Sequence, residues 1–251
     1  MKRAVMYGAG NIGRGFIGQL FSESGYEVHF LDVNEEVVNL LNRDRRYPVN
    51  VVCGPVNEEH FVENVCGVLT RDNAVAAQEI FEADIMATAV GVNVLKYIAK
   101  PIAMGVEKRM RAGRPPLNII ICENLIDANL FLKKLLLENL PEELRGKFDE
   151  NVGLVEASIG RMVPVMDEVM QAGNKLRVYV EPYNILPVDR DGFVGEIPAI
   201  ENMVPSSPFQ LFIQRKLFMH NMSHAVCAYL GFLAGDRYVY EAAARPEIRL
   251  L

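Results

Sequence analysis

The sequence lacks long apolar runs. No uninterrupted run reaches the roughly 18 residues that a membrane-spanning helix requires. The stretch MKRAVMY before the first glycine is too short for the apolar segment of a signal peptide. These absences favour a soluble protein of the cytoplasm, with no membrane among its partners.

Cysteine is scarce and scattered. Cys53, Cys66, Cys122 and Cys227 form no C-x-x-C pair, so neither a disulfide framework nor a zinc site is predicted, and a reducing compartment fits. Cys122 and Cys227 have no base at a readable spacing, and we therefore expect no thiol nucleophile. The sequence predicts no bound metal.

Positive charge is neither in excess nor clustered. Lys and Arg number 26 against 32 Asp and Glu, which gives a formal net charge of −6, and no basic run could follow a polyanion. Nucleic acid is therefore not an expected partner. The 251 residues are enough for one large domain or two modest ones. Hydrophobic residues make up 50% of them, which is enough for a buried core.

The first half of the chain alternates strand-like and helix-like segments. Short apolar runs at 4–7, 27–32, 84–90 and 117–122 predict strands, and segments ending near 22 and spanning 35–43, 94–111 and 128–140 predict helices. This alternation predicts an α/β fold with a Rossmann-type, doubly wound, mostly parallel sheet. Two further strand-like runs, 152–157 and 175–182, have no long helix between them and predict a mixed extension of the sheet.

The remainder of the chain has a different character. Residues 189–208 are rich in Pro, Gly and acidic side chains and predict a connection, whereas 209–235 is strongly apolar, lacks Pro and predicts a helix buried on most sides. We therefore divide the chain into a nucleotide-binding domain, 1–200, and the beginning of an all-helical domain, 201–251. Because one buried helix cannot cover itself, we expect the second domain to be truncated.

A glycine-rich turn follows the first predicted strand. Residues 8–13 read Gly-Ala-Gly-Asn-Ile-Gly, a G-x-G-x-x-G that opens a helix, and Asp32 ends the next strand about 20 residues on. Gly8 permits the tight turn, Gly10 lets backbone approach a pyrophosphate, and Gly13 allows close packing. The alternative is a glycine-rich turn without a ligand. We predict that the residues binding a dinucleotide are Gly8, Ala9, Gly10, Asn11, Ile12, Gly13 and Asp32.

Asp32 also indicates which dinucleotide is bound. Its carboxylate would accept hydrogen bonds from the adenosine ribose hydroxyls and would repel a 2′-phosphate. No Arg follows at Val33 or Asn34 to bind such a phosphate. The sequence therefore predicts NAD rather than NADP.

Three polar residues interrupt the apolar helix predicted over 209–235. At about 100° per residue, Asn221 lies about 140° and His224 about 80° round from Lys216, so all three can point into one wedge. Buried polar groups are costly unless paired. A buried Lys can act as a general base, an amide can donate to a developing alkoxide, and a His can orient a hydroxyl. The alternative is packing or solvent exposure, which is our interpretation of His220.

These motifs together carry a family resemblance. The pattern K-x4-N-x2-H on a helix after a Rossmann domain resembles the polyol-specific long-chain dehydrogenases, and GAGNIGRGFIG close to Met1 is similar to members acting on polyol phosphates. Residues 88–93 and 215–218 and the triplet Cys122-Glu123-Asn124 agree, and the resemblance covers essentially all 251 residues. The family continues into a larger helical domain that this chain lacks.

The resemblance implies an NAD-dependent, metal-free hydride transfer. Lys216 would take the proton from the reacting hydroxyl, Asn221 and Asn124 would stabilise the oxyanion, and His224 would hold the substrate. From sequence alone, Asn124 could equally cap a helix. Arg161 and Arg215 are candidates for a substrate phosphate, although a surface salt bridge is the better interpretation of either one singly.

The resemblance also implies a substrate class. It favours interconversion of mannitol 1-phosphate and fructose 6-phosphate by a monomeric enzyme. Two alternatives remain open, namely a dehydrogenase of unphosphorylated polyols or sugar acids and a catalytically inactive NAD-binding fragment.

Overall fold

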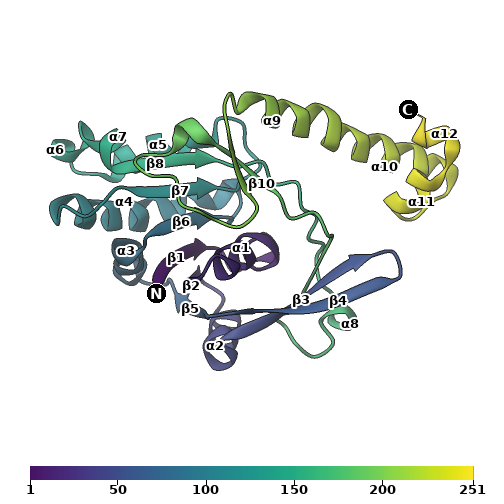
Figure 1. Ribbon diagram of the computed structural model, residues 1–251, viewed down its shortest axis with the longest axis horizontal. Coiled ribbons are helices and arrows are strands. Elements are labelled where there is room, and N and C mark those ends of the chain that lie inside the picture. The colour runs from purple at the N-terminus through teal and green to yellow at the C-terminus, as the bar shows by residue number, and fades with distance from the viewer. Residues whose placement is uncertain (251) are drawn as a thin grey trace. The chain divides into compact units, whose positions relative to one another are not determined.

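The computed structural model describes residues 1–250, which fall into two compact units, Met1–Ser207 and a second unit that begins at Pro208. A six-stranded parallel sheet forms the centre of the first unit, in the order β5-β2-β1-β6-β7-β8 (Figure 1). Its strands are β1 Lys2–Tyr7, β2 Tyr26–Asp32, β5 Val65–Leu69, β6 Ile85–Thr88, β7 Leu117–Ile121 and β8 Val152–Glu156. The strand order reverses between β1 and β6, where α/β sheets form a ligand crevice at the carboxyl ends of the strands. The predicted Rossmann fold is confirmed.

Helices cover both faces of this sheet because residues of alternating parity point to opposite sides. Ala4 and Met6 of β1 lie in a core with η1 (Gly13–Ile17) and α1 (Gly18–Glu23). Val5 and Tyr7 lie in the opposite core. The helices around that second core are α3 Asn73–Glu82, α4 Leu95–Arg111 and α5 Ala128–Asn139. The remaining helices of the sheet region are α2 Glu35–Asp44, η2 Val92–Val94, α6 Glu142–Arg145 and α7 Phe148–Asn151.

The predicted mixed extension of the sheet was wrong in its location. β8 extends the main sheet in parallel, whereas the antiparallel pairing belongs to a separate three-stranded sheet, β4-β3-β9. Its strands are β3 Arg46–Cys53, β4 Val56–Glu63 and β9 Val178–Val180. The predicted connection over 189–208 also contains η3 Arg190–Gly192 and β11 Met203–Ser206, which pairs with β10 Leu186–Asp189. A short helix, α8 Glu168–Gln171, precedes β9.

Two glycines of the glycine turn, Gly8 and Gly13, lie in contacts that leave no room for a side chain. A Cβ on Gly13 would lie 2.0 Å from the carbonyl oxygen of Gly8. Gly8 has φ +104°, and a Cβ there would lie 2.6 Å from the carbonyl oxygen of Ala89. The start of the first helix therefore lies directly against the turn, as the sequence predicted for Gly13.

The second unit contains one long helix and two short ones. The long helix consists of α9 Gln210–Arg215, a π-helical segment η4 Lys216–Asn221, and α10 Met222–Ala234. It ends at Gly235, which has the left-handed φ of 85° typical of a helix C-terminus. α11 Val239–Ala244 and α12 Pro246–Arg249 pack against the end of α10 (Figure 1). Arg245 and Asp236 form an ion pair of 2.7 Å within this unit.

The prediction that the helix over 209–235 is buried on most sides was wrong for the described residues. Gly231 is the one residue classed as buried between Gln210 and Ala234. Within its unit the helix packs only against two short helices at one end, so its apolar side chains remain exposed. The large ones are Leu211, Phe218, Met219, Met222, Tyr229, Phe232 and Leu233. None of the described helices is long and apolar enough to cross a membrane.

Candidate functional site

A pocket of about 340 Å³ opens at the carboxyl ends of β1, β2 and β6. Its volume falls within the range of small-molecule sites. Gly8 and Gly10 of the glycine turn lie on its wall beside Asp32, so the structure brings together three of the residues predicted to bind a dinucleotide. The other lining residues are Tyr7, Leu31, Val33, Thr70, Asn73, Ala89, Val90, Val94, Tyr97 and Ile98.

Asp32 is fixed at the rim of this pocket by backbone donors. The Ala9 N–H donates to Oδ2 at 2.7 Å, and the Asn34 N–H donates to Oδ1 at 2.9 Å. The neighbouring Gly8 N–H donates to the carbonyl oxygen of Leu31 at 2.8 Å. A carboxylate oxygen has more than one acceptor site, so Asp32 retains the capacity to accept from ribose hydroxyls.

Gly10 differs from Gly8 and Gly13 in having open space around it. A Cβ at Gly10 would meet no atom within 4 Å, and its φ is not positive. Neither packing nor backbone conformation therefore requires glycine here. What glycine provides is room for a ligand to approach the backbone, beside helix N–H groups that lack intrahelical partners. The arrangement fits the pyrophosphate of a dinucleotide.

Two other residues of the turn have protein partners. The side-chain amide of Asn11 donates to the carbonyl oxygen of Pro164 at 3.0 Å, so it anchors the segment after β8 to the turn. Ile12 is half-buried and packs against the core. The role predicted from the sequence for Asn11 and Ile12 therefore falls mainly on their backbone groups.

Asn124 lies immediately after β7, at the carboxyl edge of the sheet, and is exposed. It does not cap the following helix, because α5 begins at Ala128 with Asp127 in the capping position. The Ala128 N–H at the start of α5 instead donates a hydrogen bond to the Glu156 carboxylate at 2.9 Å. The helix-capping alternative for Asn124 is thus wrong.

Glu123 is a residue of this edge to which the sequence assigned no role. It is buried, and its carboxylate accepts from the Thr88 hydroxyl at 2.7 Å and from the Val90 N–H at 3.0 Å. Burial raises the pKa of Glu123, while these hydrogen bonds oppose the rise. The carboxylate joins the end of β6, which forms a wall of the pocket, to the segment that carries Asn124. Its position between Cys122 and Asn124 was the only signal in the sequence.

Lys216 and Asn221 mark the two ends of the π-helical segment in the second unit. A spacing of 100° per residue does not apply there, because π-helical hydrogen bonds run from i to i+5 and bring residues five apart nearer to one face. Both residues and His224 are half-buried, whereas His220 is exposed. π-helical turns inside α-helices occur frequently at functional sites.

His224 has a defined ring orientation. Its Nδ1 lies 2.9 Å from the carbonyl oxygen of His220. Because a carbonyl only accepts, Nδ1 carries the proton in this contact, and Nε2 is left to accept from another group when the ring is neutral. The two histidine rings lie 4.6 Å apart.

The two candidate phosphate ligands differ in their surroundings. Arg161 is 4% exposed and donates to the carbonyl oxygens of Glu181 and Gly15 and to the side chain of Gln19. Burial contradicts the interpretation of Arg161 as a surface salt bridge, and its role as a phosphate ligand stays a prediction. Arg215 is exposed and lies over the Phe212 ring at 5.0 Å.

None of the four cysteines, all of which the structure describes, forms a disulfide. Cys53 is exposed, Cys66 and Cys122 are buried, and Cys227 is half-buried. The expectation that the sequence contains no disulfide framework agrees with this arrangement.

Curated relatives share a large part of this sequence. The chain is 41% identical over 245 residues to a mannitol-1-phosphate 5-dehydrogenase of Brevibacillus brevis, covering 98% of this chain and 62% of the relative. It is 41% identical over 251 residues to the enzyme of the same name from Bacillus velezensis, covering 98% and 64%. The chain thus spans less than two thirds of the length of these relatives.

Solved structures share the fold. A Pseudomonas fluorescens mannitol 2-dehydrogenase, in ternary complex with NAD and D-mannitol, superposes with a TM-score of 0.82 at 16% identity, covering 98% of this chain and 61% of that one. A D-sorbitol dehydrogenase superposes with a TM-score of 0.83 at 14% identity, covering 99% and 63%.

Family models match both units of the chain. The mannitol dehydrogenase Rossmann domain matches residues 2–202, and the mannitol dehydrogenase C-terminal domain matches residues 209–251. The resemblance deduced from the glycine turn and the Lys–Asn–His pattern is confirmed. This chain belongs to the mannitol dehydrogenase family.

Proposed function

We propose that the chain is the NAD-binding part, with a portion of the substrate-binding part, of an enzyme that interconverts mannitol 1-phosphate and fructose 6-phosphate. The pocket formed by the glycine turn and Asp32 carries the proposal, in a chain 38–41% identical to mannitol-1-phosphate 5-dehydrogenases over 98% of its length. A dehydrogenase of unphosphorylated polyols or sugar acids is the rival within the family.

The residues of the pocket suit the parts of NAD. Asp32 would accept from the adenosine ribose hydroxyls, and the open space at Gly10 beside the helix N-terminus would admit the pyrophosphate. NAD, when bound, supplies the acceptor for the hydride that leaves the carbinol carbon.

The polar residues of the π-helical segment supply the proton chemistry in this proposal. Lys216 takes the proton from the reacting hydroxyl as general base. The side-chain amides of Asn221 and Asn124 donate hydrogen bonds to the developing oxyanion. His224, with Nδ1–H directed at the His220 carbonyl, presents Nε2 to a substrate hydroxyl. This scheme requires no metal ion.

Gly10→Ala tests the pyrophosphate subsite. We expect the Kd for NADH to rise at least about tenfold, because the methyl group would stand where the phosphates must approach. The free energy of unfolding should change by less than about 1 kcal/mol, since the methyl meets no protein atom within 4 Å. Gly146→Ala, with equally open space but no place in the pocket, is the matched control. Calorimetric titration and urea unfolding measure the two quantities, and unchanged NADH binding in Gly10→Ala would exclude this subsite.

Asp32→Ser and Asp32→Asn test the cofactor preference. Each removes the negative charge that would repel a 2′-phosphate, and Asn retains an acceptor for the Ala9 N–H. We expect NADH to bind about 10- to 100-fold more weakly in the Ser variant, the scale of a lost hydrogen bond to a charged group, and the NADH/NADPH affinity ratio to fall in both. An unchanged ratio would show that Asp32 does not contact the ribose.

Substrate choice distinguishes the two dehydrogenase assignments. With NADH in excess, we expect kcat/KM for fructose 6-phosphate to exceed that for fructose by at least about 100-fold, because a site built to pair a phosphate rejects the analogue that lacks it. A preference for fructose contradicts the phosphate assignment. NADH binding without turnover of either sugar favours the inactive NAD-binding module, and a form as long as the curated relatives then decides the substrate.

Lys216→Ala tests the general base. We expect kcat for mannitol 1-phosphate oxidation to fall about 10²- to 10⁴-fold, the scale of a lost acid–base group, and the Kd for NADH to remain unchanged. Arg249→Ala removes an exposed cation from the same unit and serves as the control. Turnover is measured in a form with the length of the relatives if the 251 residues show none. Lys216→Ala with near-parental kcat would place the base elsewhere.

A further inference from the structure

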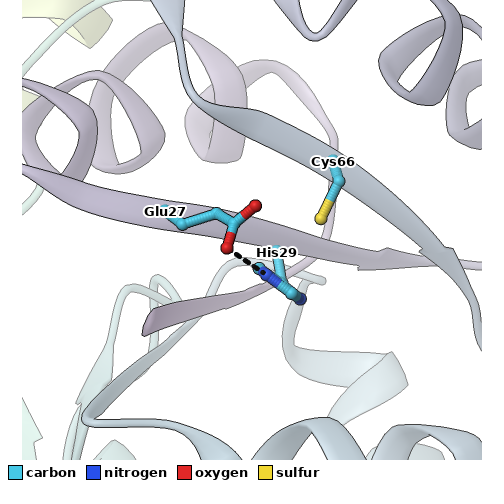
Figure 2. A group of neighbouring side chains, drawn as sticks. All are labelled: Glu27, His29 and Cys66. Carbon is cyan, nitrogen blue, oxygen red and sulfur yellow. Dashed lines mark ion pairs between the residues drawn. The ribbon is translucent and has the colours of Figure 1, made fainter. Parts of the chain in front are cut away.

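Glu27, His29 and Cys66 extend from one face of two neighbouring strands (Figure 2). His29 of β2 and Cys66 of β5 are Cα partners in the parallel register. Glu27 precedes His29 by two residues, so both side chains point to the same side of β2. One ligand atom from each residue lies within 4.8 Å of the other two. The sheet therefore brings together three types of metal ligand that are up to 39 positions apart in the sequence.

The ring of His29 is oriented by a carboxylate. Its Nδ1 lies 2.7 Å from Oε2 of Glu79, which α3 places against this face of the sheet. Its Nε2 is buried and makes no hydrogen bond, and Oε2 of Glu27 lies 3.5 Å away, too far for a strong one. Metal-binding histidines have this arrangement, in which one ring nitrogen donates to a carboxylate and the other is left for the metal.

The two carboxylates around His29 are themselves held by arginines. Oε1 of Glu27 accepts from Arg45 at 2.7 Å, which leaves Oε2 directed at His29. Glu79 accepts from Arg3 at 3.1 Å. Arg45 therefore fixes the oxygen of Glu27 that faces away from His29, whereas Arg3 shares Oε2 of Glu79 with the His29 ring.

We propose that Glu27 Oε2, His29 Nε2 and Cys66 Sγ bind one Zn²⁺ ion. Bond lengths of about 2.0–2.3 Å place tetrahedral ligand atoms roughly 3.3–3.8 Å apart, so the 3.5 Å separation between Glu27 and His29 already fits. Cys66 Sγ lies within 4.8 Å of the other two ligand atoms, so it needs to approach them by up to about 1.3 Å to reach the roughly 3.5–3.7 Å between a thiolate and a nitrogen or oxygen ligand. Glu27 is partly exposed, and water completes the coordination from that side.

The ligand chemistry selects the ion. A thiolate and an imidazole favour Zn²⁺ over the hard cations Mg²⁺ and Ca²⁺. A carboxylate and a thiolate supply two negative charges to the ion, and the Arg45 cation paired with Glu27 is offset by the Glu79 carboxylate on the other side of His29. The site lies at the amino ends of β2 and β5, whereas Asp32 and the glycine turn lie at the carboxyl end of β2. The ion would therefore fasten the edge strand β5 to β2 and would not take part in hydride transfer.

The experiment uses the 251-residue chain after chelator treatment and gel filtration. Calorimetric titration with ZnCl₂ should give one equivalent bound per chain, and the thermal unfolding midpoint should rise. CoCl₂ should produce a thiolate-to-metal charge-transfer absorption band, and MgCl₂ in large excess should not remove Zn²⁺. Failure of the untreated and chelator-treated chains to bind an equivalent of Zn²⁺ would overturn the proposal and show that the residues form only an ion-pair cluster.

Three variants locate the ion. Cys66→Ser should abolish the charge-transfer band and stoichiometric binding, whereas Cys53→Ser, at an exposed thiol outside the cluster, should leave both unchanged. Glu27→Gln changes a partly exposed side chain, so it should fold as the parent does and bind Zn²⁺ at least about tenfold more weakly. Zn²⁺ binding that survives both Cys66→Ser and Glu27→Gln would place the ion elsewhere. NADH affinity should be the same with and without Zn²⁺, which keeps this result separate from the dehydrogenase assignment.

Discussion

The contact of Gly13 with the carbonyl of Gly8 is the constraint on which the candidate site depends. Any side chain at Gly13 would collide with that carbonyl, and any side chain at Gly8 would collide with Ala89 at the end of β6. With both absent, the helix start lies against the turn and the Ala9 N–H reaches Asp32. The carboxyl ends of β1, β2 and β6 therefore lie close together, and the candidate pocket for the dinucleotide lies where they meet.

The elements of the main sheet could be predicted because each is recognisable from a short, continuous stretch of sequence. Each central strand is an apolar run followed by a helical pattern, and β1, β2, β6 and β7 occur close to their predicted positions. The hairpin β3–β4 was not predicted, because β4 has the sequence VNEEHFVE and only one of its residues is buried. The burial predicted for the helix over 209–235 was wrong for a different reason. Apolar composition predicts that a surface will be covered, but it does not identify the covering element.

The residues of the candidate site likewise differ in whether a local sequence pattern could predict them. The glycines and Asp32 are recognisable because a turn and the next strand fix their spacing, about 20 residues. Glu123 and Arg161 bond to segments far away in the sequence, and no local pattern distinguishes such residues from surface ones. His29 and Cys66 meet only through the register of β2 on β5, which is why a search for closely spaced cysteines and histidines does not find them. Lys216 and Asn221 stay candidates predicted from the sequence, and the π-helical segment that they bound changes the angle expected between them.

In the proposed enzyme, the Rossmann pocket binds the dinucleotide and the Lys–Asn–His helix acts on the substrate that the dinucleotide oxidises. A crystal structure of the ternary complex with NADH and mannitol 1-phosphate, in a form with the length of the relatives, tests this most directly. We predict the adenosine ribose against Asp32, and Lys216 Nζ within hydrogen-bond reach of the hydroxyl on the carbon that faces the nicotinamide. A complex in which Lys216, Asn221 and His224 all point away from the substrate would contradict the account, even with the dinucleotide in its pocket.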